Sequence, residues 1–236
     1  MSDDELRTRR IWRSADAVCF DVDSTVCTDE AIDELARYCR RLDEVSEITR
    51  KAMNDGMSFR DALRERLEVI SPDQALLNRF VKEKTLSLTP GIKELVECLK
   101  LRNVDVYLIS GGFKYIIVPL AHHLAIPESN VFANVLLFDE HGKYKSFDPS
   151  QPTSESGGKA KVCGLLKRQF GYSNLVMIGD GVTDLEACPP ADAFIGFGGN
   201  QVRPGVKSRS NWFVTDFEEL RLELLIGSER STKQCT

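Results

Sequence analysis

Three segments of the sequence place polar side chains directly after runs of apolar residues. In the first, AVCFDVDSTV, Asp21 and Asp23 stand one residue apart behind a run that begins at Ala17. Two carboxylates this close repel each other, which disfavours their ionised forms. The other two runs end at Ser110 and Asp180. Because the three aspartates offer only hard oxygen atoms, the pattern indicates a bound Mg²⁺ ion that offsets their repulsion.

A carboxylate beside a metal ion can also attack phosphorus and form an acyl phosphate. One aspartate of the pair would then be the nucleophile, and the other would protonate the leaving oxygen and later deprotonate water. These two roles require separated pKa values, with the metal keeping one carboxylate ionised and the less solvated partner able to carry a proton. The oxygens of the transferred group would also need a hydroxyl and a cation, for which Ser110 and Lys159 are the candidates.

The elements that would position these residues alternate between buried strands and amphipathic helices. Apolar runs predict strands within residues 17–21, 104–112, 174–184 and 192–199, and helical spacing predicts a helix over residues 158–170 that ends at Gly171. This alternation is typical of an α/β fold with a doubly wound, Rossmann-like parallel sheet. Open sheets of this kind bind ligands at the carboxyl ends of their strands, so the polar residues should converge there.

Only helical periodicity appears in the region that follows the first strand. Ser58 and Ser71 are each predicted to cap the amino end of a helix there. We therefore predict a core domain made of residues 1–27 and 86–236, and an inserted helical-bundle cap made of residues 28–85. An insertion at this point of the sheet would cover the site.

Composition and charge limit the classes of partner. Lys and Arg total 31 against 36 Asp and Glu, a net charge of −5 that argues against nucleic acid as a ligand. No apolar run approaches the length of a membrane span, and the seven cysteines include no C-x-x-C pair. We expect a soluble cytoplasmic protein with reduced thiols and a small-molecule substrate. The polar residues 201–210 are predicted to form a mobile segment.

Four motifs, in order, carry a family resemblance that spans nearly the whole chain. DVDST, ISGG, a lysine that opens a helix and GDGVTD together resemble the haloacid-dehalogenase-like phosphatases. LTPGI, NVFAN, QPTSESGGK and CPPADAFIGFGGN are similar to the members that act on O-phospho-L-serine. The resemblance implies Mg²⁺-dependent hydrolysis to L-serine and phosphate through an aspartyl-phosphate, which is the last step of L-serine biosynthesis. It is also compatible with a homodimer.

The resemblance assigns roles to individual residues. Asp21 would be the nucleophile, and Asp23 the general acid and base that also offers its backbone oxygen to the metal. Asp180 would complete the metal ligands that the protein supplies. The residues implied to support the metal loop or to hold the phosphate and substrate are Gly181, Asp184, Ser110, Gly111, Gly112, Lys159 and Thr183.

In the cap, the resemblance implies that Glu30 pairs with the substrate ammonium and that Arg66 binds its carboxylate with a forked guanidinium. Met53 would pack against the short carbon chain of the substrate. Asn54 and Ala31 stand where the family usually has glycine, which puts the fit of the substrate and closure of the cap in question. The phosphoryl chemistry is untouched by these two differences.

Other interpretations remain open from the sequence. The enzyme could act on another small phosphomonoester, or transfer phosphate to an alcohol. A signalling receiver module also accepts phosphate on an aspartate at a strand end, but it lacks the second acid and the helical insertion. Asp and Ser after a strand are also common turn residues, and Glu30 and Arg66 could be ordinary surface charges.

Overall fold

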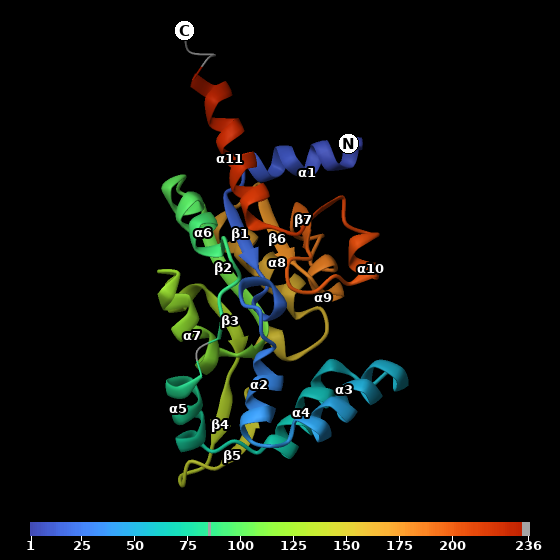
Figure 1. Cartoon of the computed structure of the whole chain (residues 1–236), viewed down its shortest axis with the longest axis vertical. Coiled ribbons are helices and arrows are strands. Elements are labelled where there is room, and N and C mark those ends of the chain that lie inside the picture. The colour runs from blue at the N-terminus through green and yellow to red at the C-terminus, as the bar shows by residue number, and fades with distance from the viewer. Residues whose placement is uncertain (85, 233–236) are drawn as a thin grey trace.

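The computed structural model of the chain describes residues 1–84 and 86–232, and the side chains of all of these except 53–55 and 227–232. Within these residues the centre is a sheet of six parallel strands in the order β3-β2-β1-β6-β7-β8 (Figure 1). The strands are β1 (Ala17–Phe20), β2 (Asp105–Phe113), β3 (Val131–Asn134), β6 (Leu175–Gly179), β7 (Ala193–Phe197) and β8 (Trp212–Val214). The predicted doubly wound parallel sheet is confirmed.

Strand β1 lies in the middle of the sheet and is fully buried, because helices cover both faces. Val18 and Phe20 face the larger core, which they share with α1, α6, α7 and α11, whereas Ala17 and Cys19 face a smaller core with α8. The helices of this layered core are α1 (Asp3–Arg13), α6 (Ile92–Leu101), α7 (Lys114–His123), α8 (Gly158–Phe170), α9 (Val182–Leu185), α10 (Pro204–Lys207) and α11 (Phe217–Thr232).

The register of the sheet brings three strand ends together. Phe20, the last residue of β1, pairs with Leu108 on one side and with Ile178 on the other. Ser110 and Asp180, each two residues beyond these partners, therefore lie on either side of the loop that follows β1. This alignment is what positions the site.

The helices α2 (Ala31–Tyr38), α3 (Leu42–Asp55), α4 (Phe59–Ile70) and α5 (Gln74–Glu83) lie beyond the carboxyl ends of the strands (Figure 1). A hairpin formed by β4 (Leu136–Phe138) and β5 (Tyr144–Phe147) lies beside these helices. The turn of this hairpin contacts α5, because the Gln74 amide donates to the Gly142 carbonyl at 2.9 Å. The sequence patterns did not predict this hairpin. Among the described residues, no helix is both long and apolar enough to cross a membrane.

Helix ends agree with the sequence at two of three predicted positions. Gly171 ends α8 in the left-handed conformation, with a φ of 73°, and Ser58 caps α4 by accepting from the Asp61 amide. The prediction for Ser71 is wrong, because Ser71 ends α4 with a φ of 42°. The Asp73 carboxylate caps α5 instead, accepting from the Leu76 amide at 2.7 Å. Ser71 and Asp73 are both residue types that cap helix amino ends, but α4 extends to Ile70 and uses Ser71 as its C-cap, which leaves Asp73 to cap α5.

Candidate active site

Asp21 and the loop Val22–Val26 follow β1 directly and carry the paired aspartates. Asp21 stays extended, and its amide donates to the Ile178 carbonyl of β6 at 2.9 Å. Asp23 is also extended, but the next residue, Ser24, turns the chain sharply with a φ of 55°. Both aspartates therefore remain at the edge of the sheet, while the loop leads into α2.

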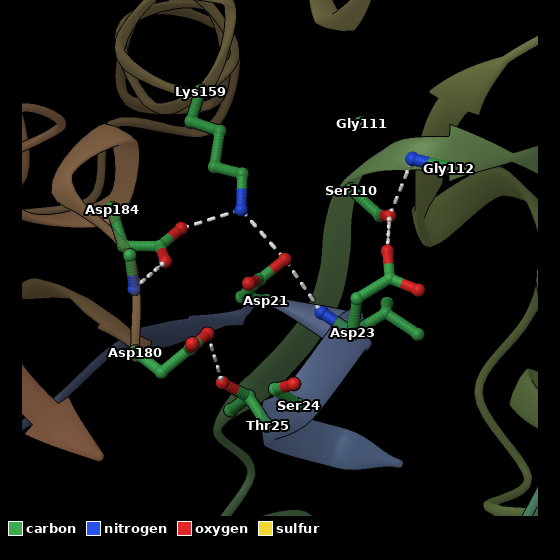
Figure 2. Close-up of polar contacts among 12 residues, drawn as sticks. Asp21, Asp23, Ser24, Thr25, Ser110, Gly111, Gly112, Lys159, Asp180 and Asp184 are labelled. Carbon is green, nitrogen blue, oxygen red and sulfur yellow. Dashed lines mark hydrogen bonds and ion pairs between the residues drawn. The ribbon is translucent and has the colours of Figure 1, made fainter. Parts of the chain in front are cut away.

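Lys159 joins two buried carboxylates across the site (Figure 2). Its Nζ lies 2.6 Å from Asp21 Oδ1 and 2.5 Å from Asp184 Oδ1. Asp184 is also fixed by the Gly181 amide, which donates to Oδ2 at 2.9 Å. Because Lys159 opens α8 and Asp184 belongs to α9, this ion-pair network links two helices to the loop after β1.

The charges of this network perturb one another. Burial raises the pKa of Asp21 well above its ordinary value, and the Asp184 carboxylate adds to that shift, while Lys159 opposes it. Burial alone would lower the pKa of Lys159, but Asp184 and Asp21 outweigh it and the net shift is upward. The lysine is therefore held as a cation beside Asp21, where it can receive an anionic group.

Asp23 is held in a different environment, on the side of the site nearest β2. Its Oδ1 accepts from the Ala31 amide at 2.7 Å, and its Oδ2 accepts from the Ser110 hydroxyl at 3.0 Å. Ser110 Oγ in turn accepts from the Gly112 amide at 2.8 Å (Figure 2). Burial raises the pKa of Asp23, although the two hydrogen bonds lower it. The residue is thus suited to carry a proton.

A cluster of carboxylates could hold a metal ion. Asp21, Asp180 and Asp184 each offer an oxygen, and these oxygens all lie within 4.8 Å of one another. Asp180 also accepts from the Thr25 hydroxyl at 3.3 Å. An all-oxygen donor set of this kind fits Mg²⁺, because a hard cation prefers carboxylate oxygen.

The cluster opens into a cavity of about 390 Å³. Its lining includes the predicted residues Asp21, Asp23, Glu30, Gly111, Lys159, Asp180, Gly181 and Thr183. Ser110 and Gly112 stand next to it through their bonds with Asp23 and with each other. A Cβ atom at Gly112 would lie 3.1 Å from Ser110 Oγ and 3.2 Å from Asp23 Oδ2, so a side chain there would crowd both groups. Position 112 at the end of β2 therefore requires a residue without a side chain.

Glu30 reaches the cavity from the amino end of α2. Its Oε1 accepts from the Ser24 hydroxyl at 2.8 Å. Burial raises its pKa to about 7, and the Asp23 carboxylate contributes to the shift. Near neutral pH this group is poised between its charged and neutral forms, so a cation placed beside it would favour the charged form.

Arg66 lies near Glu30 without lining the cavity. Its Nε donates to the Ala62 carbonyl at 3.0 Å within α4. Burial lowers its pKa, while Asp33 and Glu30 raise it, which places the guanidinium in the electrostatic reach of both acids. The side chain of Met53, the third residue predicted for the cap, lies outside the described residues.

Arg203 is a residue of this site that the sequence patterns missed. Its Nε lies 2.7 Å from Asp180 Oδ2, and it also pairs with Glu30 at 3.5 Å. It caps the amino end of α10 and lines the cavity, within the segment 201–210 that was predicted to be mobile. The available signal was its place after β7, since loops that follow strands of one parallel sheet meet at one edge.

Helix α4 supplies two further contacts that the sequence did not indicate. The Phe59 ring lines the cavity and would stand 2.9 Å from a Cβ atom at Gly111. The neighbouring Arg60 donates to Ser154 Oγ at 2.9 Å and lies 3.1 Å from Glu155 Oε2. These contacts hold α4 against the loop that precedes α8, and so cover the site.

Known proteins match the chain over most of its length. Residues 15–192 match the haloacid dehalogenase-like hydrolase family. The phosphoserine phosphatase of Rattus norvegicus is 56% identical over 216 residues, which are 92% of this chain and 96% of the rat protein. The chain belongs to the phosphoserine phosphatase family. The sequence resemblance is thereby confirmed.

Solved structures extend this family likeness to the fold. A phospho-aspartyl intermediate analogue of phosphoserine phosphatase has a TM-score of 0.72 at 26% identity, covering 86% of this chain and 94% of that one. DsGPDH of Dunaliella salina has a TM-score of 0.78 at 39% identity and matches 92% of this chain. The match covers 37% of the DsGPDH chain, so the present chain corresponds to about a third of that longer protein.

Proposed function

We propose that this protein hydrolyses O-phospho-L-serine to L-serine and inorganic phosphate, the last step of L-serine biosynthesis. The observation that carries the proposal is the joint arrangement of Asp21 and Asp23, with Lys159 on one and Ser110 on the other, in a chain 56% identical to a phosphoserine phosphatase. The enzyme is a phosphatase acting on a small molecule. Its preference for phosphoserine is the finer statement to be tested.

The first step would form an aspartyl-phosphate. An oxygen of the Asp21 carboxylate attacks phosphorus, and the bond from phosphorus to the serine oxygen breaks. Asp23 gives its proton to that leaving oxygen, which the upward shift of the Asp23 pKa supports. Lys159 and the Gly111 amide would hold the phosphate oxygens, because cations and backbone N–H groups stabilise the charge of the transferring group.

The second step would hydrolyse the intermediate. Asp23, now ionised, takes a proton from a water molecule, and the water oxygen bonds to phosphorus. The acyl phosphate bond breaks, so inorganic phosphate leaves and the Asp21 carboxylate is restored. Ser110 would keep Asp23 oriented in both steps, since its hydroxyl bonds to Asp23 Oδ2 while the Gly112 amide fixes Ser110.

Mg²⁺ would be held by the carboxylates of Asp21 and Asp180 and the backbone oxygen of Asp23. When bound, it supplies positive charge that offsets the carboxylates and the substrate phosphate. Asp184 would support this site from the side, because its carboxylate is already engaged with Lys159 and the Gly181 amide. Arg203 would help to orient Asp180.

The helices of residues 28–85 would act as a cap that closes over the substrate. Glu30 would pair with the substrate ammonium, which its position on the cavity wall supports. Arg66, close to Glu30, would bind the substrate carboxylate, and Met53 would contact the carbon chain. Thr183 would contact the substrate from the metal loop.

A substrate panel tests the proposal. Phosphate release from O-phospho-L-serine should exceed release from other phosphomonoesters in kcat/KM, and a chelator should abolish it. Arg66→Ala should raise KM for phosphoserine, whereas Arg64→Ala, on the same helix and exposed, should not. A higher kcat/KM for another ester, or transfer of phosphate to an added alcohol, would replace the proposed substrate or reaction.

Asp21→Asn tests the nucleophile. The variant should keep its fold and lose turnover, because an amide oxygen is a poor nucleophile. Asp29→Asn is the matched control, since Asp29 lies in the same stretch of chain but outside the carboxylate cluster. Full activity of Asp21→Asn would refute the assigned role.

The proposed homodimer and cytoplasmic location are checked by sedimentation and by fractionation of the source cells.

A further inference from the structure

A second cavity, of about 740 Å³, lies at the opposite edge of the sheet from the candidate active site. Asn174 and Asn211, which line it, stand directly before β6 and β8, so the cavity is at the amino ends of these strands. Arg7 and Arg10 line it from α1, and Arg209 from the chain that follows α10. We call this space the basic cavity.

The three arginines of the basic cavity have no hydrogen-bond or ion-pair partner for their guanidinium groups within the described part of the chain. This differs from Arg9 and Arg13 on the same helix, which both pair with the buried Glu223. Helix α1 thus directs Arg9 and Arg13 to α11, whereas Arg7 and Arg10 are exposed and line the basic cavity. Uncompensated guanidinium groups are ready to bind anions, because their donors match carboxylate and phosphate oxygens.

Acidic side chains do not cancel this charge. Of the two carboxylates that line the basic cavity, Asp192 is already engaged by Lys167 at 2.6 Å and by the Leu175 amide at 2.9 Å. Asp4 is the other one. Three arginines therefore face one uncommitted carboxylate, in a protein whose net charge is −5. The volume is within the range of cavities that bind small organic ligands.

We propose that the basic cavity binds a small organic anion that carries at least two phosphate or carboxylate groups, and that this anion modulates the active site. A single charge would leave two of the guanidinium groups unmatched, whereas a multiply charged ligand would bridge α1 and the segment after α10. Both phosphate esters and polycarboxylates offer this chemistry.

Two short connections link the basic cavity to the active site. The first begins with Asp180 and Asp184 in the carboxylate cluster, runs through α9, and reaches the basic cavity at Leu185 and Cys188. The second begins with Arg203 and runs through α10 to Arg209. A ligand that holds the far ends of both connections acts on the segments that position the carboxylate cluster, and coupling between two sites is reciprocal.

Calorimetric titration with pyrophosphate and with citrate tests the binding. Arg7→Ser/Arg209→Ser should raise the dissociation constant for the bound anion roughly tenfold or more, since two charge-assisted contacts are lost. Arg221→Ser removes one arginine outside the basic cavity as a control, because Arg221 lies on α11, pairs with Glu218 and lines neither cavity. It should leave the dissociation constant within about twofold of wild type. Tighter binding of pyrophosphate indicates a phosphate ester as ligand, and tighter binding of citrate a polycarboxylate.

No binding of either anion up to about 10 mM, or equal binding by the double variant and wild type, would overturn the proposed site. The coupling is tested at constant free Mg²⁺ by measuring kcat/KM with and without the anion. The anion should change kcat/KM in wild type and Arg221→Ser but not in the double variant. An equal change in all three would trace the effect to chelation or to the active site, and no change in any would refute the coupling.

Discussion

Replacing Lys159 by methionine should lower both the thermal stability of the protein and its turnover. Lys159 is 9% exposed, and its Nζ is within 2.6 Å of carboxylate oxygens of both Asp21 and Asp184. Methionine keeps most of the side-chain volume but removes the charge. Two buried carboxylates, with Asp180 beside them, would then lack their cation.

The expected cost follows from this geometry. Removing one partner of a buried ion pair costs about 3–5 kcal/mol, because the remaining charge is left without compensation. For a chain of this size, 1 kcal/mol lowers Tm by about 2–4 °C, so the loss should be roughly 6–20 °C near pH 8. Turnover should fall at least about a hundredfold, since the cation beside the transferring phosphate is lost.

The destabilisation should depend on pH. The carboxyl groups of Asp21 and Asp184 already have raised pKa values in the folded state, and loss of Lys159 would raise them further. Raised folded-state values mean that the folded chain binds more protons than the unfolded chain above about pH 4, so stability falls as pH rises through that window. The difference in Tm between the variant and wild type should therefore be smaller at about pH 5 than at about pH 8.

Thermal unfolding measures the loss in Tm and its pH dependence, and a chelator is added so that no metal ion compensates the carboxylates. Lys159→Met/Asp184→Asn should regain much of the lost Tm, because one uncompensated charge is removed, but it should not regain activity. An unchanged Tm for Lys159→Met at about pH 8, or a double variant no more stable than the single one, would refute the view that Lys159 compensates buried charge.

Three further predictions concern the acid, the cap and the metal. Asp23→Asn should lower kcat by roughly 10²–10⁴-fold, measured by steady-state phosphate release, and a loss below about tenfold would contradict its role. Arg60→Met should raise KM by up to roughly tenfold with less effect on kcat, because the contacts of α4 with Ser154 and Glu155 are lost. Arg64→Met is the control for that variant, and equal KM values would exclude the effect. Mg²⁺ should raise Tm more at about pH 7.5 than at about pH 5.5, because protonated carboxylates bind metal poorly, and a scan with the opposite order would contradict the carboxylate site.

Local patterns in the sequence predicted the sheet and most of the site, for a physical reason that particular residues illustrate. A short unbroken apolar run ending in Asp21 fits a strand covered on both faces, and polar residues after such strands meet at one edge of a parallel sheet. Asp180 and Ser110 follow the same logic. The left-handed C-cap at Gly171 was equally local, since glycine adopts that conformation without strain.

Tertiary structure decided the features that depend on which segments meet in space. Arg203 joins Asp180 and Glu30 only because the chain after β7 returns to the same edge of the sheet. Arg60 meets Glu155 through the placement of α4 over the loop before α8. No spacing along the chain encodes such contacts, because their partners lie far apart in sequence and are selected by packing. The sequence by itself determined strands β1, β2, β6 and β7 and the chemistry at the strand ends, whereas packing decided which charges are compensated and which, as in the basic cavity, are left open.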